Sequence, residues 1–226
     1  MTEGPSEDEG VDLLGIVAIG DPILRRPAEP VDPSAITTGA FQRLIEQMHV
    51  TMLAAPGVGL AAPQVGVGVR LAVIEDLSER WGALDPSTLA ERERTQLPFT
   101  VLINPAVEPV DRAGYATFYE ACLSMPGYAG AVERARVVRV SALGADGEPF
   151  SATYTGWAAR IVQHEVDHLD GRIYVDRVAT RSMSTSENLV RLQHLPIDEI
   201  AAELGFSVSA GQTSPKGAPS RCPYQG

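Results

Sequence analysis

The chain has 226 residues, enough for one domain of ordinary size, and 44% of them are hydrophobic, which is normal for a globular protein. No apolar run approaches the ~20 residues that span a bilayer, which argues against a membrane protein. The net charge of −11, from 18 basic and 29 acidic residues, argues against specific or nonspecific binding to nucleic acid and to anionic membranes.

The first ten residues are acidic and polar, and they lack the basic start and apolar core of a signal peptide. We therefore expect them to be disordered and the protein to be cytoplasmic. In that reducing compartment the two cysteines, Cys122 and Cys222, should not form a disulfide. A single domain is predicted over residues 11–205, followed by a flexible tail, 206–226, that is rich in serine, glycine and proline.

Two helical segments are predicted near the N-terminus. Asp21 followed by Pro22 is typical of a helix start, because aspartate caps the first turn and proline suits its first position. Apolar residues at helical spacing predict a second helix over residues 40–54, which ends at Pro56 and Gly57.

A glycine-rich loop, 57–68, and a strand, 69–74, follow this helix. Residues 76–98 are polar and charged, and Glu91–Arg94 is interpreted as a solvated run. We therefore expect residues 76–98 to form a surface insertion.

The second half of the chain predicts short strands before one long helix. Residues 144–147, Gly-Ala-Asp-Gly, are a hairpin signal. A helix is predicted over 156–169 and a short amphipathic helix over 197–204. Neighbouring strands with helices before and after them predict an α+β fold. The expected strands are 100–103, 106–110, 115–119, 132–143, 149–155 and 173–175.

The long helix carries an H-E-x-x-H motif. His164 and His168 are four residues apart, so they lie on one helical face and can bind one metal ion. Glu165 lies beside them, where it can reach a water on that metal. The same pattern also occurs by chance on solvated helices. A catalytic metal usually takes three protein ligands, so a third ligand must come from elsewhere.

Three sources of the third ligand are weighed against the sequence. Glu187 lies 19 residues after His168, which is similar to the distal glutamate of thermolysin-like peptidases. The histidine that metzincins place six residues after the motif is absent, because Tyr174 is there. The remaining candidate is Cys122. His49 lies on an apolar helix and is expected to be a packed or half-exposed side chain rather than a ligand.

Three separate segments together resemble the peptide deformylases. Gly57–Gln64 reads Gly-Val-Gly-Leu-Ala-Ala-Pro-Gln and matches the family's first motif, GxGLAAPQ. Glu120–Ser124 matches the second motif, EGCLS, except at Ala121. Gln163–His168, with the Leu and Gly that follow, matches the third, QHExDHLxG. The order and spacing also fit, and the resemblance covers residues from about 16 to 177.

This resemblance implies antiparallel and mixed β-sheets wrapped around the central H-E-x-x-H helix, with an N-terminal helix and a C-terminal extension. It implies Cys122, His164 and His168 as metal ligands, with hydroxide on the metal attacking the formyl carbon. Glu165 is then general base and acid, and the Gln64 side chain and the Leu123 N–H stabilise the oxyanion. The residues expected to bind substrate are Gly57, Val58, Gly59, Glu120 and Ala121.

The family's substrate is the N-terminal formyl-methionine of nascent polypeptides, from which it releases formate. Ligand types alone favour zinc, whereas the resemblance implies Fe²⁺, with Zn²⁺ or Ni²⁺ able to occupy the site. Transient association with the ribosome is a further expectation. However, the C-terminal helix is acidic (Asp198, Glu199, Glu203) and does not suit docking on RNA.

Asp167 is expected to support the site, either by orienting a ligand or by pairing with Arg134, and two independent surface charges are the alternative. Ala121 departs from the family's glycine. If that glycine requires a positive φ, alanine costs about 1 kcal/mol, and if it leaves room for substrate, the extra methyl narrows the side-chain pocket.

Two other functions remain open from the sequence. One is a divergent deformylase copy that serves inhibitor resistance or a specialised substrate, for which Ala121 is the motif-level hint. The other, more remote, is a thermolysin-like metallopeptidase that uses Glu187.

Overall fold

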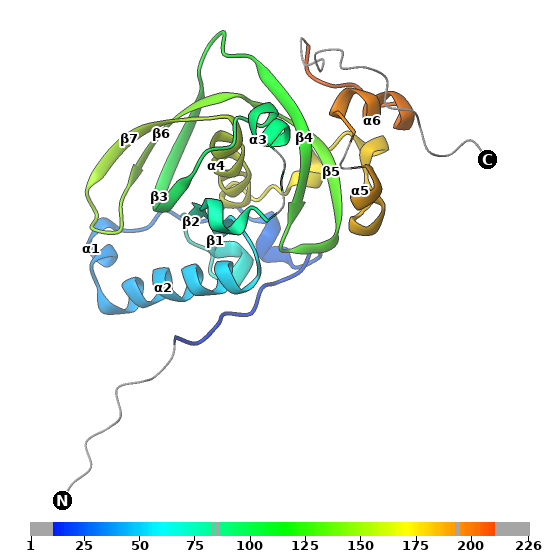
Figure 1. The fold of residues 1–226 in the computed structure, drawn as a ribbon. Helices are drawn as coiled ribbons and strands as arrows, with labels where there is room; N and C mark the ends of the chain where they lie inside the picture. The colour runs from blue at the N-terminus through cyan, green and yellow to red at the C-terminus, as the bar shows by residue number, and fades with distance from the viewer. Residues whose placement is uncertain (1–10, 83, 85, 193–194, 211–226) are drawn as a thin grey trace, which may run out of the picture.

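The computed structural model describes residues 11–82, 84, 86–192 and 195–210. In Figure 1 a single helix, α4 (Gly156–Leu169), lies among the strands of two antiparallel sheets, with α2 (Gly39–Ala54) below the larger sheet and α5 and α6 beside β5. The predicted α+β class is confirmed. No helix in the described ranges is long and apolar enough to cross a bilayer.

In both sheets, every pair of neighbouring strands that the structure describes is antiparallel. The larger has the order β1-β2-β3-β6-β7, so β1 is an edge strand, and the smaller has the order β4-β5-β8. The strands are β1 (Gly59–Ala61), β2 (Leu71–Asp76), β3 (Leu97–Pro109), β4 (Tyr115–Cys122), β5 (Met125–Ala135), β6 (Val137–Leu143), β7 (Pro149–Thr155) and β8 (Ser184–Thr185).

Apart from α2 and α4, the helices are short. They are α1 (Pro33–Ile36), α3 (Pro86–Glu91), α5 (Ser186–Leu192) and α6 (Ile197–Leu204), with 3₁₀ turns η1 (Pro22–Arg25), η2 (Ala62–Val65), η3 (Ser78–Arg80), η4 (Tyr174–Asp176) and η5 (Thr180–Ser182).

Elements with a strong local signal form where the sequence predicts them. The helices α4 and α6 and the strand β7 have the predicted bounds, and α2 begins one residue early behind a Thr38 cap. Asp21 caps η1 by accepting from the Ile23 N–H at 3.0 Å, as its position before Pro22 predicts. The β6–β7 hairpin closes through Gly144 N to Glu148 O, 2.9 Å.

Other strand boundaries were predicted wrongly. The strands expected at 100–103 and 106–110 are one strand, β3, with a register shift between Ile103 and Ala106. Asn104 sits at this bulge with φ 50°, and its side-chain amide bonds both the N–H and the carbonyl of Val31 at 2.8 Å. The strand expected over 132–143 is two strands, β5 and β6, and 173–175 lies at the start of a 3₁₀ turn.

The 57–68 segment is more ordered than a connecting loop. It contains the edge strand β1 and the turn η2, in which Gln64 accepts from the Ala61 N–H at 2.9 Å. The segment therefore extends the larger sheet by one strand, whose first residue lies against Glu165 of α4.

The 76–98 segment is attached to the domain rather than standing free. The Asp76 carboxylate, 1% exposed, accepts two hydrogen bonds from Arg94, at 2.8 and 2.7 Å, and one from the Trp81 indole at 2.8 Å. The Arg94 side chain is only 11% exposed, so the interpretation of Glu91–Arg94 as a solvated run is wrong for this residue.

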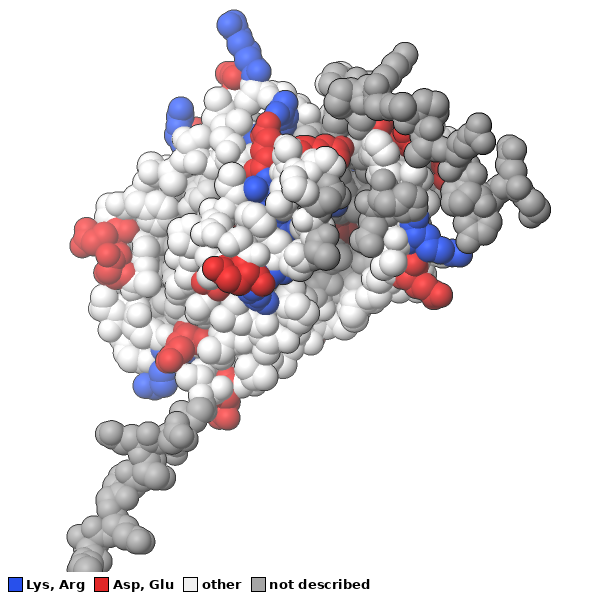
Figure 2. Space-filling model, viewed as in Figure 1, with Lys and Arg blue, Asp and Glu red and all other residues white. Residues whose placement is uncertain are grey.

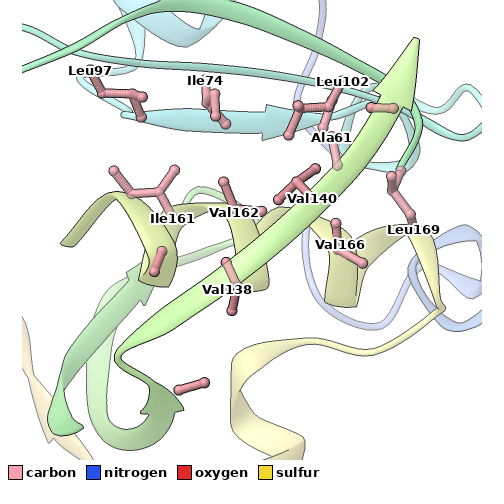
Figure 3. Packing of buried hydrophobic residues seen from close by; sticks show 14 of the residues in the cluster. Ala61, Ile74, Leu97, Leu102, Val138, Val140, Ile161, Val162, Val166 and Leu169 are labelled. Atoms are coloured by element: carbon pink, nitrogen blue, oxygen red, sulfur yellow. The ribbon is translucent and has the colours of Figure 1, made fainter. Parts of the chain in front are cut away.

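The main core lies between α4 and the larger sheet. In Figure 3, Ile161 and Val162 of α4 point toward sheet side chains such as Ile74 and Val140. Burial of this stripe holds the motif helix in place, because each fully buried aliphatic side chain contributes about 1.5–3 kcal/mol of transfer free energy. The labelled members of this cluster are Ala61, Ile74, Leu97, Leu102, Val138, Val140, Ile161, Val162, Val166 and Leu169.

The ends of the chain bear on two further predictions. Residues 1–10, expected to be disordered, and 211–226, most of the expected tail with Cys222, lie outside the described residues. Within the described part of the tail, Ser209 is 4% exposed and donates to Glu133 at 2.9 Å. This residue packs against the β4–β5 sheet.

Charged side chains are interspersed on the face drawn in Figure 2. Basic and acidic residues alternate among uncharged ones there, and the basic ones on the described part of this face do not merge into one extended patch.

The turn after α4 provides a test of the backbone geometry. Gly171 has φ 73°, and a Cβ there would lie 2.9 Å from backbone atoms of Arg25. We expect Gly171→Ala to lower the free energy of unfolding by about 2 kcal/mol or more, because it adds both strain and a backbone clash. Urea unfolding followed by circular dichroism measures this. Gly68→Ala is the control, since its Cβ would meet nothing within 4 Å, and equal losses in the two variants would contradict the explanation.

Candidate metal centre and adjoining cleft

Three predicted ligands meet between β4 and α4. Cys122 is the last residue of β4, where a register shift after Ala121 changes the direction of the strand. Its Sγ lies 3.2 Å from His168 Nε2, and one donor atom each from Cys122, His164 and His168 lies within 4.8 Å of the others. His168 is fully buried and Cys122 is 7% exposed. One thiol and two imidazoles at this spacing fit a divalent transition metal with an open fourth position.

His164 is oriented by a carboxylate. Its Nδ1 lies 2.9 Å from Glu120 Oε2. Burial alone would raise the pKa of Glu120, but Arg134, His164 and Arg160 outweigh it and hold that pKa well below its ordinary value. An ionised carboxylate only accepts hydrogen bonds, so Nδ1 carries a proton, and Nε2 is the ring nitrogen that a metal would bind.

Two arginines hold Glu120 in turn. Arg134 of β5 donates to both carboxylate oxygens at 2.9 Å, and Arg160 of α4 donates to Oε1 at 2.6 Å. Arg160 also donates to the carbonyls of Val132 at 2.9 Å and Ala116 at 2.6 Å. Burial lowers the pKa of Arg160 to about 10, so it remains a cation at neutral pH. Arg160 was not among the predicted site residues.

The predicted ion pair between Arg134 and Asp167 is present. Asp167 is also held by Arg177, at 2.8 and 3.0 Å, and by Arg172 at 3.1 Å. Burial would raise the pKa of Asp167, but the arginines, Arg134 first, keep it below its ordinary value. One guanidinium, that of Arg134, therefore bridges two carboxylates: Glu120, which contacts His164, and Asp167, which precedes His168 in the chain.

Glu165 packs directly against the glycine-rich segment. It is 3% exposed, and a Cβ on Gly59 would lie 2.2 Å from its Oε1 and 2.6 Å from its Cδ. Burial raises the pKa of Glu165 to about 7. Among the described residues, its Oε2 has no hydrogen-bond partner. The carboxyl group is therefore desolvated and has one oxygen available to a bound water or substrate.

Gln64 and Leu123 lie beside the thiol. The Gln64 amide nitrogen is 3.5 Å from Cys122 Sγ and 3.3 Å from Ser124 Oγ, while its oxygen is occupied by the Ala61 N–H. The amide is thus oriented with its N–H groups toward the centre. Within the described chain no carbonyl accepts from the Leu123 N–H. Ser124, 1% exposed, was not predicted to take part.

A cleft of about 440 Å³ opens onto this centre. Gly57, Val58 and Gly59 form one part of its wall, Ala121 and Leu123 line it from the end of β4 and the residue after it, and a face of α4 forms what is here called the floor. Ala121 has no positive φ, so the first of the two alternatives, backbone strain, does not apply, and this exposed residue lines the cleft.

The other candidates lie elsewhere. Glu187 is the second residue of α5 and does not belong to the metal-capable group formed by the described residues. His49 stacks on Phe99, with ring centroids 3.8 Å apart, and contacts Glu75, as a half-exposed packed side chain should.

The chain is similar to known proteins over most of its length. Residues 13–184 match the family model of polypeptide deformylase. The chain belongs to the polypeptide deformylase family. Peptide deformylase 3 of Streptomyces avermitilis is 49% identical over 86% of this chain and 85% of its own length. The chloroplastic/mitochondrial peptide deformylase 1A of Arabidopsis thaliana is 41% identical over 86% of this chain and 71% of its own length.

Solved deformylase structures have the same fold. The class I type b peptide deformylase of Acinetobacter baumannii with Met-Ala-Ser bound is 33% identical, with a TM-score of 0.66, over 75% of this chain and all of that one. The Synechococcus elongatus enzyme in complex with actinonin is 37% identical, with a TM-score of 0.61, over 86% of this chain and 89% of that one. The predicted family and its hydrolase activity are confirmed.

The contact between Gly59 and Glu165 gives a test of the deformylase site. We expect Gly59→Ala to lower kcat by about 10²-fold or more, because the added methyl displaces the Glu165 carboxylate. Formate release from a formyl-peptide measures this, with metal content and melting temperature measured alongside. Gly68→Ala is the matched control, since its Cβ would meet nothing within 4 Å and the residue does not line the cleft. Equal activity in the two variants would refute the assignment.

Proposed function

We propose that this deformylase removes the formyl group from the N-terminal formyl-methionine of nascent polypeptides in the cytoplasm, using one Fe²⁺ per chain. The observation that carries the proposal is the meeting of Cys122, His164 and His168 beside the desolvated carboxyl group of Glu165, within a cleft. This combination is suited to hydrolysing an amide with a metal-activated water.

Cys122 Sγ, His168 Nε2 and His164 Nε2 would hold the metal. When bound, a divalent ion supplies Lewis acidity that lowers the pKa of a water from about 15.7 toward 7. Zn²⁺ or Ni²⁺ could occupy the same donor set. Fe²⁺ beside a thiolate would make the enzyme sensitive to oxygen, because both groups oxidise.

Glu165 is the proton carrier of the proposal. Its unpartnered Oε2 accepts the proton of the attacking water, and the same oxygen returns it to the departing amine. A pKa raised to about 7 by burial suits both steps, since the group then gains and loses a proton at little cost.

The formyl oxygen becomes negatively charged as the water attacks. The Gln64 Nε2–H and the Leu123 N–H are the proposed donors to it, because both lie beside Cys122 and one is oriented by Ala61. A donor of this kind is typically worth about 10²–10³ in rate.

The substrate chain is proposed to pair with the wall formed by Gly57, Val58 and Gly59. This wall continues into β1, which is an edge strand of its sheet and can accept an extended peptide as one further strand. Glu120 and Ala121, which line the same cleft, are the other residues proposed to face the bound peptide. The tripeptide Met-Ala-Ser in the Acinetobacter baumannii relative is a ligand of the size that this wall would accept.

The proposed partners are formylated nascent chains, with transient contact to the ribosome. Because α6 carries Asp198, Glu199 and Glu203, that contact would not run through a basic helix. No structural observation favours a resistance copy or a peptidase, since the catalytic set is complete and Glu187 lies outside it.

Metal content tests the ligand set. We expect Cys122→Ala to lose its metal and its formate release, because the two histidines alone bind a divalent ion weakly. Glu187→Ala should keep both, and Glu165→Gln should keep the metal but lose turnover. Anaerobic purification, elemental analysis and formate release from formyl-Met-Ala-Ser measure the three variants. Metal loss in Glu187→Ala with retention in Cys122→Ala would favour a peptidase.

Ala121 tests the width of the cleft. We expect Ala121→Gly to raise kcat/KM for bulky first side chains by about three- to tenfold, because a methyl group at the pocket entrance is removed. Ala152→Gly on β7, outside the cleft, controls for the cost of glycine in a strand. An unchanged substrate profile would show that the methyl does not meet the substrate.

A further inference from the structure

The turn formed by Arg92, Glu93 and Arg94, here called the 92–94 turn, is fixed against the start of α4. Arg94 anchors it through the buried carboxylate of Asp76. Glu93 pairs with Arg136 of the β5–β6 connection, and the Arg136 carbonyl accepts from the Gly156 N–H at 2.8 Å. The 92–94 turn and the first residue of α4 are therefore both bonded to Arg136.

Gly156 shows how close this contact is. A Cβ there would lie 2.4 Å from Glu93 Cβ, 2.6 Å from the Glu93 carbonyl oxygen and 2.8 Å from that of Arg92. Its φ of 55° is also in the left-handed region. The backbone of the 92–94 turn thus packs directly against the residue that precedes Trp157.

The Trp157 indole is held by this turn through its ring face. Arg92 Cζ lies 4.9 Å and Arg94 Cζ 5.5 Å from the ring centroid. Phe118 meets the ring at 6.3 Å in an edge arrangement. The indole N–H is buried and has no acceptor among the described residues, so a hydrogen bond does not orient the ring. Its orientation depends on the groups stacked against it.

Trp157 also lines the cleft. Trp157, Ile161 and His164 recur at helical spacing, so they share one face of α4, the cleft floor. Trp157 lies seven residues before His164, which at 1.5 Å per residue is about 10 Å along the helix axis. A peptide paired with the Gly57–Gly59 wall points alternate side chains into the cleft, so its first side chain extends over this floor toward Trp157.

We propose that the 92–94 turn determines side-chain specificity from outside the cleft, by holding Trp157 as the end wall of the subsite for the first residue. The inference rests on the proposed function for the placement of the substrate. An indole fixed about 10 Å along the helix axis from His164 defines a subsite for a long, unbranched apolar side chain such as the thioether chain of methionine. Short side chains leave the subsite unfilled.

Peptide binding tests this without turnover. The metal-loaded protein is titrated with the product tripeptides Met-Ala-Ser and Ala-Ala-Ser by calorimetry, and the ratio of the two Kd values is the selectivity. The variants are Arg92→Met, which removes the nearest guanidinium, and the double variant Asp76→Asn/Arg94→Met, which leaves no unpaired buried charge. Trp157→Leu removes the end wall itself. Arg139→Met, exposed on β6 and outside the cleft, is the matched control.

The selectivity for Met-Ala-Ser should fall by about threefold or more in Arg92→Met and in the double variant, further in Trp157→Leu, and not at all in Arg139→Met. Unchanged selectivity in folded Arg92→Met and double variants would overturn the role of the turn. Unchanged selectivity in Trp157→Leu would overturn the end wall. A parent that binds Met-Ala-Ser selectively but releases no formate from formyl-Met-Ala-Ser would refute the proposed function alone.

Discussion

The buried carboxylate of Glu120 is the interaction on which the centre depends. It joins β4 to β5 through Arg134 and both strands to α4 through Arg160 and His164. Each of these charges would be expensive to bury alone, and removing one partner of such a cluster typically costs about 3–5 kcal/mol. The cluster is stable only when the strand that ends at Cys122 and the helix that carries the histidines hold one fixed position relative to each other. The same contacts that offset the burial of these charges therefore align Cys122, His164 and His168, the group that could hold a metal.

Close backbone approaches set a second constraint on α4. Gly156 at its start touches the Glu93 backbone, Gly171 after its end touches Arg25, and Gly59 beside its middle touches Glu165. At the first two positions both the backbone angle and the available space exclude a side chain, whereas at Gly59 the space alone does so. The helix is therefore located at both ends and at its catalytic turn by segments far away in sequence. This explains in physical terms why the second glycine of the first motif accompanies a glutamate more than a hundred residues later.

The predictable parts of the structure are those whose signal is local. The bounds of α4 follow from its apolar spacing and the glycines near its ends. The bulge at Asn104 could not be predicted in this way, because it occurs at a non-glycine residue and is stabilised by Val31, 73 residues away. The motifs alone are enough to assign Cys122, His164 and Glu165 to one site. Arg160 was missed because it lies on the motif helix at an apparently ordinary position, and its partner Glu120 is 40 residues away. A cationic residue on the face of a helix that also carries apolar core residues was the available signal.

Arg160 also limits what the cleft can accept. Although it lines the cleft floor, its guanidinium already donates to Glu120, to Val132 and to Ala116, and it lies 5.3 Å from the Phe118 ring. An acidic side chain in the subsite would have to compete with these contacts for the Arg160 guanidinium, because that cation is already paired. An apolar side chain requires no such exchange, since it meets the Trp157 and Ile161 surfaces beside the arginine. The charges of Arg160 and Glu120 are thus paired, and under the proposed function the cleft would select for apolar surface even though its floor contains an ion-pair cluster.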